Sequence, residues 1–385
     1  MQFQFATAAR IVFGPGTVND VPSYASDMGR RALLLTGKNA GRAEGLMAGL
    51  ASAGLSVTLF SIGSEPTTDL VLEGASTARE AGCDLVVAQG GGSVIDAGKA
   101  VAALLTNPGD LFDYLEVVGK ARAIANPPVP YVAVPTTAGT GTEVTKNAVI
   151  ISPGHKVKVS MRSDLMLPRL VVVDPELSCS MPPEVTAATG LDALTQLIEA
   201  FVTQKAGPLT DGICREGLAR AARSLQRAWE NGNDRAARED MCLASLFSGM
   251  ALANAGLGAV HGFAAPIGGS FDAPHGVVCA RLLPYVMEAN INALASRRPN
   301  SPVIRRYEEM ARILTGDPYA LAAQGVEWVK RLCRKLGIPG LSILGLTRQD
   351  IPGITAAALR ASSMKGNPIA LTEEELFHVM RKAIS

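Results

Sequence analysis

The stretch "DLVVAQGGGSVIDAGKAVAALL", from Asp84 to Leu105, decides the fold of this 385-residue chain. An apolar, strand-like run leads into three consecutive glycines at positions 90–92, and a helical segment begins near Ser93. Glycines between a strand and a helix let the backbone approach a ligand closely, and they also occur in ordinary tight turns. The stretch therefore predicts one strand–helix unit of an α/β domain with a candidate ligand loop.

The surrounding segments repeat this strand–helix alternation. Their strand-like runs are continuous in Val and Leu instead of alternating with polar residues, and amphipathic helices separate several of them. Strands that are apolar on both faces belong to a parallel sheet covered on both sides by helices. The predicted strands are 31–37, 56–61, 84–89, 130–137 and 169–177.

The pattern changes after Asp174. From Pro182 onward the apolar residues follow helical periodicity only, and the last helical segment, 371–384, starts with a capping box from Thr372 to Glu375. A chain of 385 residues is also too long for a single hydrophobic core. We therefore predict an α/β domain at 1–179 and an all-α domain at 180–385.

Composition limits the partners. The net charge is +1 and no long charged run occurs, so neither nucleic acid nor a membrane surface is expected as a partner. The first residues lack the pattern of a signal peptide, and the 6 cysteines form no CxxC pair. We expect a cytoplasmic protein with reduced thiols.

Two loops are candidates for cofactor binding. Gly91, Gly92 and Ser93 open a helix whose amides and dipole would favour a phosphate. A second loop, "PTTAGTGTEVT" at 135–145, also follows a strand and offers five hydroxyls. Either loop alone is compatible with a plain turn, but two at the carboxyl ends of parallel strands indicate the ligand edge of the sheet.

The helical half contains a candidate metal site. Asp192 and Gln196 lie four residues apart, hence on one helix face, and Asp192 has apolar neighbours. His261 and His275 are separated by a glycine-rich segment and could reach the same point. One carboxylate and two imidazoles suit Fe²⁺ or Zn²⁺, whereas each histidine taken alone is compatible with an ordinary core position.

These motifs, in this order, resemble the iron-containing (group III) alcohol dehydrogenase family. The resemblance rests on "FGPG", "GGGSVIDAGKA", "PTTAGTGTEVT", "DPEL", "MPPEVTAATGLDALT" and "GLGAVHG…PHG", and it extends nearly along the whole chain. It implies that the α/β domain at 1–179 binds a dinucleotide and that the helical domain at 180–385 holds the metal and the substrate. It further implies hydride transfer between a nicotinamide and a small alcohol or aldehyde, with a divalent metal polarising the oxygen.

Matching positions carry over as follows. The resemblance implies that Asp192, His261 and His275 are metal ligands. It also implies a cofactor site made of Gly91, Gly92 and Ser93 at the pyrophosphate with Asp96 nearby, Thr136, Thr137, Thr140 and Thr145 along the cofactor, Leu177 on the nicotinamide side and Lys158 at the ribose.

Two departures concern the metal. Most family members have His where this sequence has Gln196, which can offer only a neutral carbonyl oxygen as a fourth ligand. Many members also carry a further His, thought to help move the proton, where this sequence has Ala265. The glycerol dehydrogenase and dehydroquinate synthase relatives manage with three protein ligands, so a metal stays plausible. The maleylacetate reductases leave a metal-independent enzyme open.

A third departure concerns the cofactor. NAD-preferring members often place Asp at the position of Gly37, where a carboxylate would repel a 2′-phosphate. Gly37 removes that repulsion, and Lys38 or Arg42 could favour the phosphate, although Gly37 also suits a turn. We expect NAD(P)(H), with NADP(H) accepted.

The leading hypothesis is a metal-dependent, NAD(P)-dependent alcohol dehydrogenase or aldehyde reductase that forms a dimer or larger homo-oligomer. The main alternative is a metal-independent reductase of a larger or anionic carbonyl substrate, with Arg162 as a candidate anion contact. A dehydroquinate-synthase-like lyase and a non-catalytic binding protein are further alternatives. The lyase would show no net change in NADH.

Overall fold

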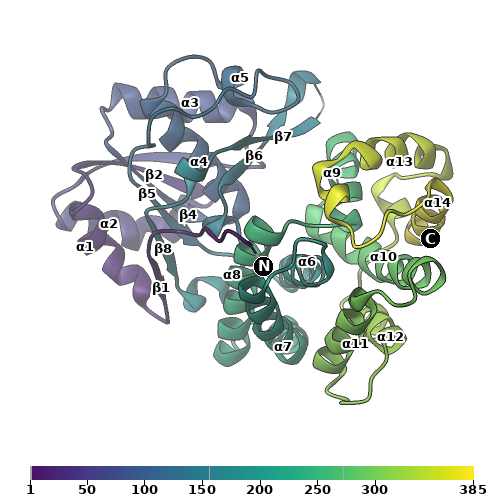
Figure 1. The fold of residues 1–385 in the computed structure, drawn as a ribbon. Helices are drawn as coiled ribbons and strands as arrows, with labels where there is room; N and C mark the ends of the chain where they lie inside the picture. Colours follow the sequence, from purple (N-terminus) through teal and green to yellow (C-terminus); the bar gives the residue numbers. More distant parts are fainter. Residues whose placement is uncertain (1, 156, 272) are drawn as a thin grey trace. The chain divides into compact units, whose positions relative to one another are not determined.

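The computed structural model describes residues 2–155, 157–271 and 273–385 (Figure 1). The chain forms two compact units. The sheet unit comprises Ala6–Thr137 and Gly141–Ser178, and the helical unit comprises Cys179–Ser385 together with the short segments 2–5 and Ala138–Thr140. The main division at Cys179 lies beside the expected boundary, and the two short segments join the helical unit from within the first half of the chain.

A six-stranded parallel sheet is the centre of the sheet unit, which confirms the predicted fold class. Residues of the central strands are almost all fully buried, as their continuous apolar sequences require. The strands run in the order β1 (Ile11–Phe13), β8 (Leu170–Val173), β5 (Tyr131–Pro135), β4 (Leu85–Gly90), β2 (Arg31–Gly37) and β3 (Ser56–Ile62).

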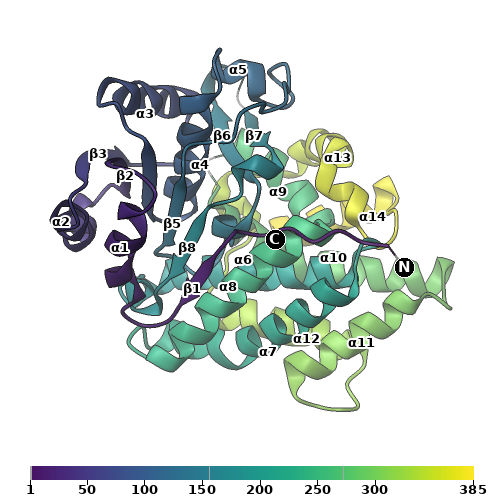
Figure 2. The same cartoon turned by 60° about the vertical axis from the view of Figure 1, so that its left-hand side comes forward.

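Helices cover both faces of this sheet. Figures 1 and 2 place α1 (Val21–Ser26) and α2 (Glu44–Ser52) on one face, and α3 (Thr68–Glu80) and α4 (Gly92–Thr106) on the other. On the α1–α2 face, the helices pack their apolar side chains against alternate residues of β2, β4, β5 and β8. A short helix, α5 (Leu111–Tyr114), follows α4.

The edge strand β1 was not predicted from the sequence, and neither was the antiparallel hairpin of β6 (Asn147–Ser152) and β7 (Val157–Arg162). Its strands alternate buried with partly exposed positions, and β7 carries Lys158 and Arg162. A short half-buried strand that contains charged residues gives only a weak pattern.

The strand order creates a switch point between β2 and β4. From β2 the chain moves outward to β3, and then it crosses back to β4 and continues in the opposite direction to β5 and β8. Thr36 pairs with Gln89, so Gly37 and Gly90 end neighbouring strands at the same edge. Open parallel sheets bind ligands at the carboxyl ends of the strands, at such a point.

The helical unit is built around α6 (Pro183–Val202), which packs against α7, α8, α10 and α11. All α6 residues from Gly190 to Val202 are buried, as expected for a helix that is apolar around most of its circumference. The other helices are α7 (Pro208–Glu230), α8 (Arg235–Ala255), α9 (Ala259–Ser270), α10 (His275–Arg297), α11 (Pro302–Thr315), α12 (Ala322–Lys335), α13 (Ile351–Arg360) and α14 (Glu373–Ile384).

Within the described ranges, no single helix has the length and hydropathy of a membrane span. The consecutive helices α8 and α9 reach the required length and composition only as a pair that is bent by 100°.

A buried ammonium group ties α4 to the loop after β5. Lys99 Nζ donates to the carbonyl of Thr142 at 2.8 Å and to the hydroxyl of Thr145 at 3.0 Å, and it lies 3.2 Å from the Asp96 carboxylate. Asp96 also accepts the hydroxyl of Thr142 and the amide of Val149. This network fixes the start of α4 against the threonine-rich loop.

Glu143 is buried beside this network, and burial raises the pKa of its carboxyl to about 7. A carboxyl whose pKa is higher in the folded than in the unfolded chain costs stability as the pH rises, because the unfolded chain releases its proton first. In the variant Glu143→Gln this cost is absent. We expect the unfolding free energy of Glu143→Gln, relative to that of the wild type, to increase by on the order of 3 kcal/mol between pH 5 and pH 8.

Chemical denaturation at both pH values measures this difference. The matched control is Glu73→Gln, which makes the same change at an exposed position of α3 outside the Lys99 network. A Glu143→Gln profile parallel to the wild type would mean that the buried carboxyl does not titrate in this range.

Candidate functional site

The switch-point edge of the sheet unit has the geometry of an anion site. The helix α4 starts at Gly92, and its N-cap Gly91 offers no side chain to cap the first turn. The first amides of the helix have no partner within the helix, so they and the helix dipole favour a phosphate. A Cβ atom at Gly90 would lie 2.5 Å from Val94 Cγ2, so the tight turn before the helix requires glycine.

The start of the threonine-rich loop lies beside this helix start. The amide of Thr136 donates to the carbonyl of Gly90 at 2.9 Å, and a Cβ atom at Gly91 would lie 3.3 Å from the methyl group of Thr137. Of the residues expected to bind the cofactor, the structure thus brings five together at one edge: Gly91, Gly92, Ser93, Thr136 and Thr137.

The other expected cofactor residues are placed differently. Asp96 and Thr145 belong to the buried Lys99 network, and Lys158 on β7 forms an ion pair with Glu65 at 2.6 Å. Leu177 packs, half-buried, against the sheet core. Thr140 falls in the helical unit and Gly37 ends β2 at the switch point. The cofactor roles of all these residues stay predictions.

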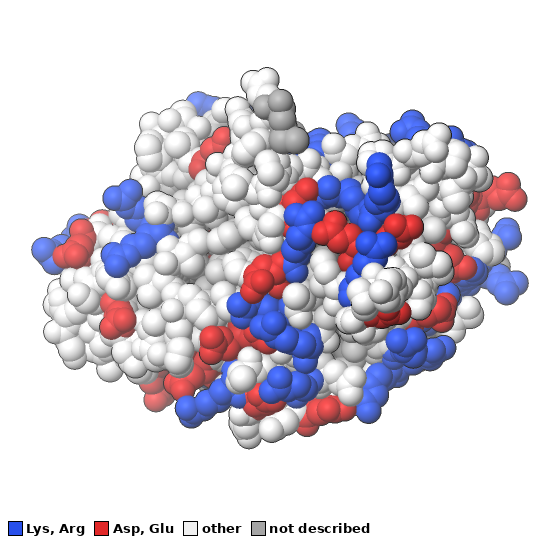
Figure 3. Space-filling model, turned by 60° about the horizontal axis from the view of Figure 1, so that its bottom comes forward, with Lys and Arg blue, Asp and Glu red and all other residues white. Residues whose placement is uncertain are grey.

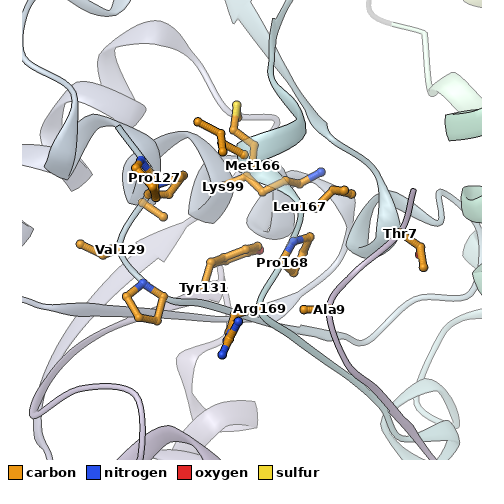
Figure 4. Close-up of a pocket in the computed structure, with 14 residues that line it drawn as sticks. Thr7, Ala9, Lys99, Pro127, Val129, Tyr131, Met166, Leu167, Pro168 and Arg169 are labelled. Atoms are coloured by element: carbon orange, nitrogen blue, oxygen red, sulfur yellow. The ribbon is translucent and has the colours of Figure 1, made fainter. Parts of the chain in front are cut away.

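The sheet unit also contains a pocket of about 370 Å³, away from the switch-point edge (Figure 4). It is formed by the residues that lead into β5 and β8, Pro127–Pro130 and Leu165–Arg169, by the first residue of β5, Tyr131, and by the stem of Lys99. It therefore lies at the amino ends of these strands, and no expected cofactor residue lines it. Dinucleotides bind at the carboxyl ends, so this pocket is not the cofactor site.

In the helical unit, three predicted metal ligands converge from three helices. Asp192 lies on α6, His261 on α9 and His275 at the start of α10. Asp192 Oδ1 is 3.4 Å from His261 Nε2 and 3.8 Å from His275 Nε2. The approach depends on Gly276, since a Cβ atom there would lie 2.3 Å from the carbonyl oxygen of Ala188 on α6.

Cys279 joins this cluster, which sequence reasoning did not predict. It lies one helical turn after His275, and its Sγ is 3.6 Å from His275 Nε2 and 3.8 Å from His261 Nε2. The ligand atoms of Asp192, His261, His275 and Cys279 all lie within 4.8 Å of one another. The sequence could have indicated Cys279, because it follows His275 by four residues and so lies on the same helix face.

Gln196 faces Asp192 but uses both polar atoms within the unit. Its amide nitrogen donates to Asp192 Oδ2 at 3.1 Å, and its carbonyl oxygen accepts the Ser248 hydroxyl at 2.7 Å. In this arrangement Gln196 orients the Asp192 carboxylate. The predicted role of Gln196 as a ligand stays a prediction.

Glu199 is a second functional residue that sequence reasoning missed. One carboxylate oxygen lies 2.6 Å from His261 Nδ1, and the other accepts the amide of Val260 at 2.7 Å. A carboxylate on the outer nitrogen fixes the imidazole so that Nε2 points into the cluster, as is common behind metal-binding histidines. Glu199 lies two helical turns after Asp192 on α6, a spacing visible in the sequence.

The electrostatics of the cluster fit a cation. Burial alone would lower the pKa of His261, but the negative charges of Cys279 and Glu199 raise it well above its usual value. The charge of Cys279 likewise raises the pKa of His275. Burial would raise the pKa of Asp192, yet the two histidines outweigh it and hold this pKa low. The cluster thus attracts positive charge.

Asp192 Oδ1 gives the clearest test of whether a metal fits. This oxygen is buried, and in the described part of the chain it has no hydrogen-bond partner. A buried carboxylate oxygen without a partner is costly, and a cation bound to the cluster would satisfy it. Oxygen, imidazole and sulfur donors suit a divalent ion such as Fe²⁺ or Zn²⁺.

A helix start suited to an anion at the switch point of a parallel sheet, and a cluster of potential metal donors in a helical unit, are features of the metal-dependent dinucleotide-binding enzymes. Comparisons with known proteins identify the family within this class. Residues 8–175 match the iron-containing alcohol dehydrogenase family, and residues 186–384 match the C-terminal part of the same family.

Individual relatives agree. The chain is 36% identical to 1,3-propanediol dehydrogenase of Klebsiella pneumoniae over 380 residues, which is 96% of each chain. It is 37% identical to 4-hydroxybutyrate dehydrogenase of Cupriavidus necator over 364 residues, which is 92% of each chain. A crystal structure of 1,3-propanediol oxidoreductase superposes with a TM-score of 0.92 at 34% identity and covers 100% of both chains.

The chain belongs to the iron-containing alcohol dehydrogenase family, which confirms the resemblance found in the sequence. It is an oxidoreductase that transfers a hydride between a nicotinamide cofactor and a small alcohol or aldehyde. The cluster around Asp192 would hold a divalent metal, which would supply positive charge at the substrate oxygen.

Removal of the Glu199 carboxylate should weaken metal binding through His261. We expect Glu199→Ala to lower the affinity for Zn²⁺ by roughly 10- to 100-fold, because the imidazole loses the partner that fixes its orientation. Glu199→Gln can still accept a hydrogen bond from Nδ1, so its loss should be smaller. Competition with a chromophoric chelator measures both affinities.

The control for this experiment is Glu216→Gln, which changes an exposed carboxylate paired with Arg220 on α7. Its metal affinity should equal that of the wild type. Wild-type affinity in Glu199→Ala would show that the orientation of His261 does not depend on the carboxylate.

Proposed function

We propose that this enzyme interconverts short, linear primary alcohols and aldehydes with NAD(P)(H), and that Asp192, His261 and His275 hold Fe²⁺ or Zn²⁺ for this reaction. The observation that carries the proposal is the convergence of these three side chains at the buried Asp192 Oδ1, which accepts no hydrogen bond among the described residues. The relatives' substrates, 1,3-propanediol and 4-hydroxybutyrate, support a small linear molecule with a second polar end.

The chain's own residues have distinct tasks in this reaction. The bound metal would supply positive charge that stabilises the developing alkoxide as the hydride is transferred. Glu199 and Gln196 hold His261 and Asp192 in position. The His275 side chain is 37% exposed, whereas that of Asp192 is 3% exposed, so substrate would reach the cluster from the side of His275.

The alcohol proton requires another route in this enzyme. Ala265 stands where many family members carry a histidine, and it is exposed. An alanine side chain can neither accept nor donate a proton. We therefore assign proton transfer to water or to a hydroxyl group instead of an imidazole at this position.

For the cofactor, we propose that NADP(H) is accepted as well as NAD(H). A Cβ atom at Gly37 would meet nothing within 4 Å, so close packing does not demand glycine there. The absence of a carboxylate side chain at this position leaves room for a 2′-phosphate, and the nearby Lys38 and Arg42 are exposed.

The variant Gly37→Asp tests this assignment. A carboxylate at the end of β2 should raise KM for NADPH by roughly 10-fold or more through like-charge repulsion, while KM for NADH stays within a few-fold. Gly37→Asn has the same size without the charge, so its KM for NADPH should change much less. Equal changes for both cofactors in Gly37→Asp would contradict the assignment.

We also propose a cytoplasmic homo-oligomer, a dimer or larger. All six cysteines are free in the structure, consistent with a reducing compartment. Figure 3 shows Lys and Arg interspersed with Asp and Glu on the face it draws, without a continuous basic patch that would attract nucleic acid there. Only 18% of the residues are charged, a composition compatible with subunit contacts.

A nicotinamide assay tests the proposed function. The purified full-length chain, loaded anaerobically with Fe²⁺ or Zn²⁺, should oxidise NADH or NADPH in the presence of 3-hydroxypropanal. A chelator should abolish this activity, and either ion should restore it.

Other outcomes of this assay would contradict the proposal. No nicotinamide oxidation with any small linear aldehyde would exclude the activity. Undiminished turnover after complete metal removal would favour the metal-independent reductase, although Arg162, its candidate anion contact, faces Glu116 at 3.6 Å. Turnover without net change in NADH would favour the lyase.

A further inference from the structure

We propose that the thiolate of Cys279 is the fourth protein ligand of the metal site, and that it makes the site selective for Zn²⁺ over Fe²⁺. The proposal shares its site with the proposed function but rests on the geometry and chemistry of the four donors. The fourth ligand would thus come from α10, whereas the family pattern in the sequence placed the candidate fourth ligand on α6, at Gln196.

Gln196 is poorly placed to be that ligand. Its carbonyl oxygen is the only atom of the side chain that could bind a cation, and the buried hydroxyl of Ser248 donates to it at 2.7 Å. Its amide nitrogen holds Asp192 Oδ2. A cation at Gln196 would have to share the carbonyl oxygen with the Ser248 hydroxyl, and turning the amide toward the cation would break these hydrogen bonds inside a buried region.

Four of the six distances between the donors of the cluster are close to those of a tetrahedral zinc site, and all six are within 4.8 Å. Usual zinc bond lengths place the donors of such a site about 3.3 Å apart for nitrogen and oxygen, and about 3.6 Å apart for nitrogen and sulfur. The nitrogen–oxygen distances to Asp192 Oδ1 are 3.4 Å from His261 and 3.8 Å from His275. The nitrogen–sulfur distances to Cys279 are 3.8 Å and 3.6 Å.

A second observation points to a cation between these donors. Asp192 Oδ1, one corner of the cluster, is buried without a hydrogen-bond partner among the described residues. The Cys279 side chain is fully buried, and its Sγ contacts the two imidazoles. Cys333, another buried cysteine of the same unit, instead donates to the carbonyl of Ala280 at 3.4 Å. Cys279 therefore differs from a packing cysteine.

The chemistry of a thiolate decides the metal. Soft sulfur ligands favour Zn²⁺, and the usual affinity order already places Zn²⁺ above Fe²⁺ at a given site. Asp192 and Cys279 would each contribute one negative charge, which balances a divalent ion in a buried place, while both imidazoles bind in the neutral form. His275 and Cys279 come from consecutive turns of α10, so the helix itself fixes two of the four donors.

Cobalt spectroscopy of the full-length protein tests this assignment without reference to activity. After removal of metal with a chelator, Co²⁺ should give a thiolate-to-cobalt charge-transfer band in the near ultraviolet. The band should be absent in Cys279→Ala and retained in the matched control Cys333→Ser, whose hydroxyl can still donate to Ala280. Circular dichroism checks folding, and Cys279→Ser, which nearly keeps the side-chain volume, serves if the alanine variant does not fold.

Affinity measurements separate a ligand from an orienting residue. Cys279→Ala should lower the affinity for Zn²⁺ by more than the roughly 10- to 100-fold typical of an outer-shell partner, and Gln196→Ala should stay within that range. Under anaerobic competition between equal concentrations of Zn²⁺ and Fe²⁺, the wild type should retain Zn²⁺. The preference for Zn²⁺ should be smaller in Cys279→Ala.

A wild-type cobalt spectrum without the band, or a band that persists in Cys279→Ala or Cys279→Ser, would overturn the assignment of the ligand. An unchanged preference for Zn²⁺ in Cys279→Ala would overturn the assigned selectivity. These outcomes differ from failure of the proposed function. A thiolate band in a protein that reduces no aldehyde would support the ligand and refute the activity, and an active enzyme without the band would do the reverse.

Discussion

Asp192 places a carboxylate in the interior of α6, and the arrangement of the helical unit around it follows from the need to compensate that charge. A buried carboxylate is tolerated only where hydrogen bonds or cations surround it. Gln196 satisfies one of its oxygens, and two imidazoles approach the other. Close packing requires glycine at positions such as Gly276, which contacts Ala188, and this packing lets the imidazoles reach the carboxylate.

The outer contacts extend the same requirement. His261 can present Nε2 to the cluster only if its other nitrogen has a fixed partner, and Glu199 supplies that partner from two turns further along α6. Glu199 also accepts the amide of Val260 at the start of α9. One helix thus carries the first carboxylate of the cluster and the group that orients an imidazole from another helix. The rigidity of α6 therefore sets the geometry of the site.

The sheet unit satisfies its polar groups in a different way. At the switch point, amides of the first turn of α4 are left without helical partners, and glycines expose them to a ligand. Behind that edge, Lys99 satisfies several oxygen atoms of the adjoining loop and leaves none of its own hydrogens exposed. A rigid, fully bonded layer thereby supports an edge with open donors, which is the combination an anion site needs.

Sequence patterns were sufficient for five of the six strands of the sheet and for three of the clustered side chains; the edge strand β1, of three residues, was missed. Continuous apolar strands, glycines before α4 and a carboxylate among apolar residues each carry a strong local signal. The hairpin of β6 and β7 carries a weak one, because its half-buried strands include Lys158 and Arg162. Asp96 shows another limit, since a residue near a phosphate loop in sequence forms its contacts with a buried lysine.

Cys279 and Gln196 show why the remainder required coordinates. Cys279 lies four residues after His275 on α10, and Gln196 lies four residues after Asp192 on α6. Spacing alone therefore makes both equally good candidates for the fourth ligand. Their contacts in the structure distinguish them. The polar atoms of Gln196 form hydrogen bonds with Ser248 and Asp192, whereas the sulfur of Cys279 faces two imidazoles. A turn of α10 can thus provide what the family's usual pattern takes from a turn of α6. The fourth ligand can come from a different helix because a metal site requires a donor atom at a given place, whichever part of the sequence supplies it.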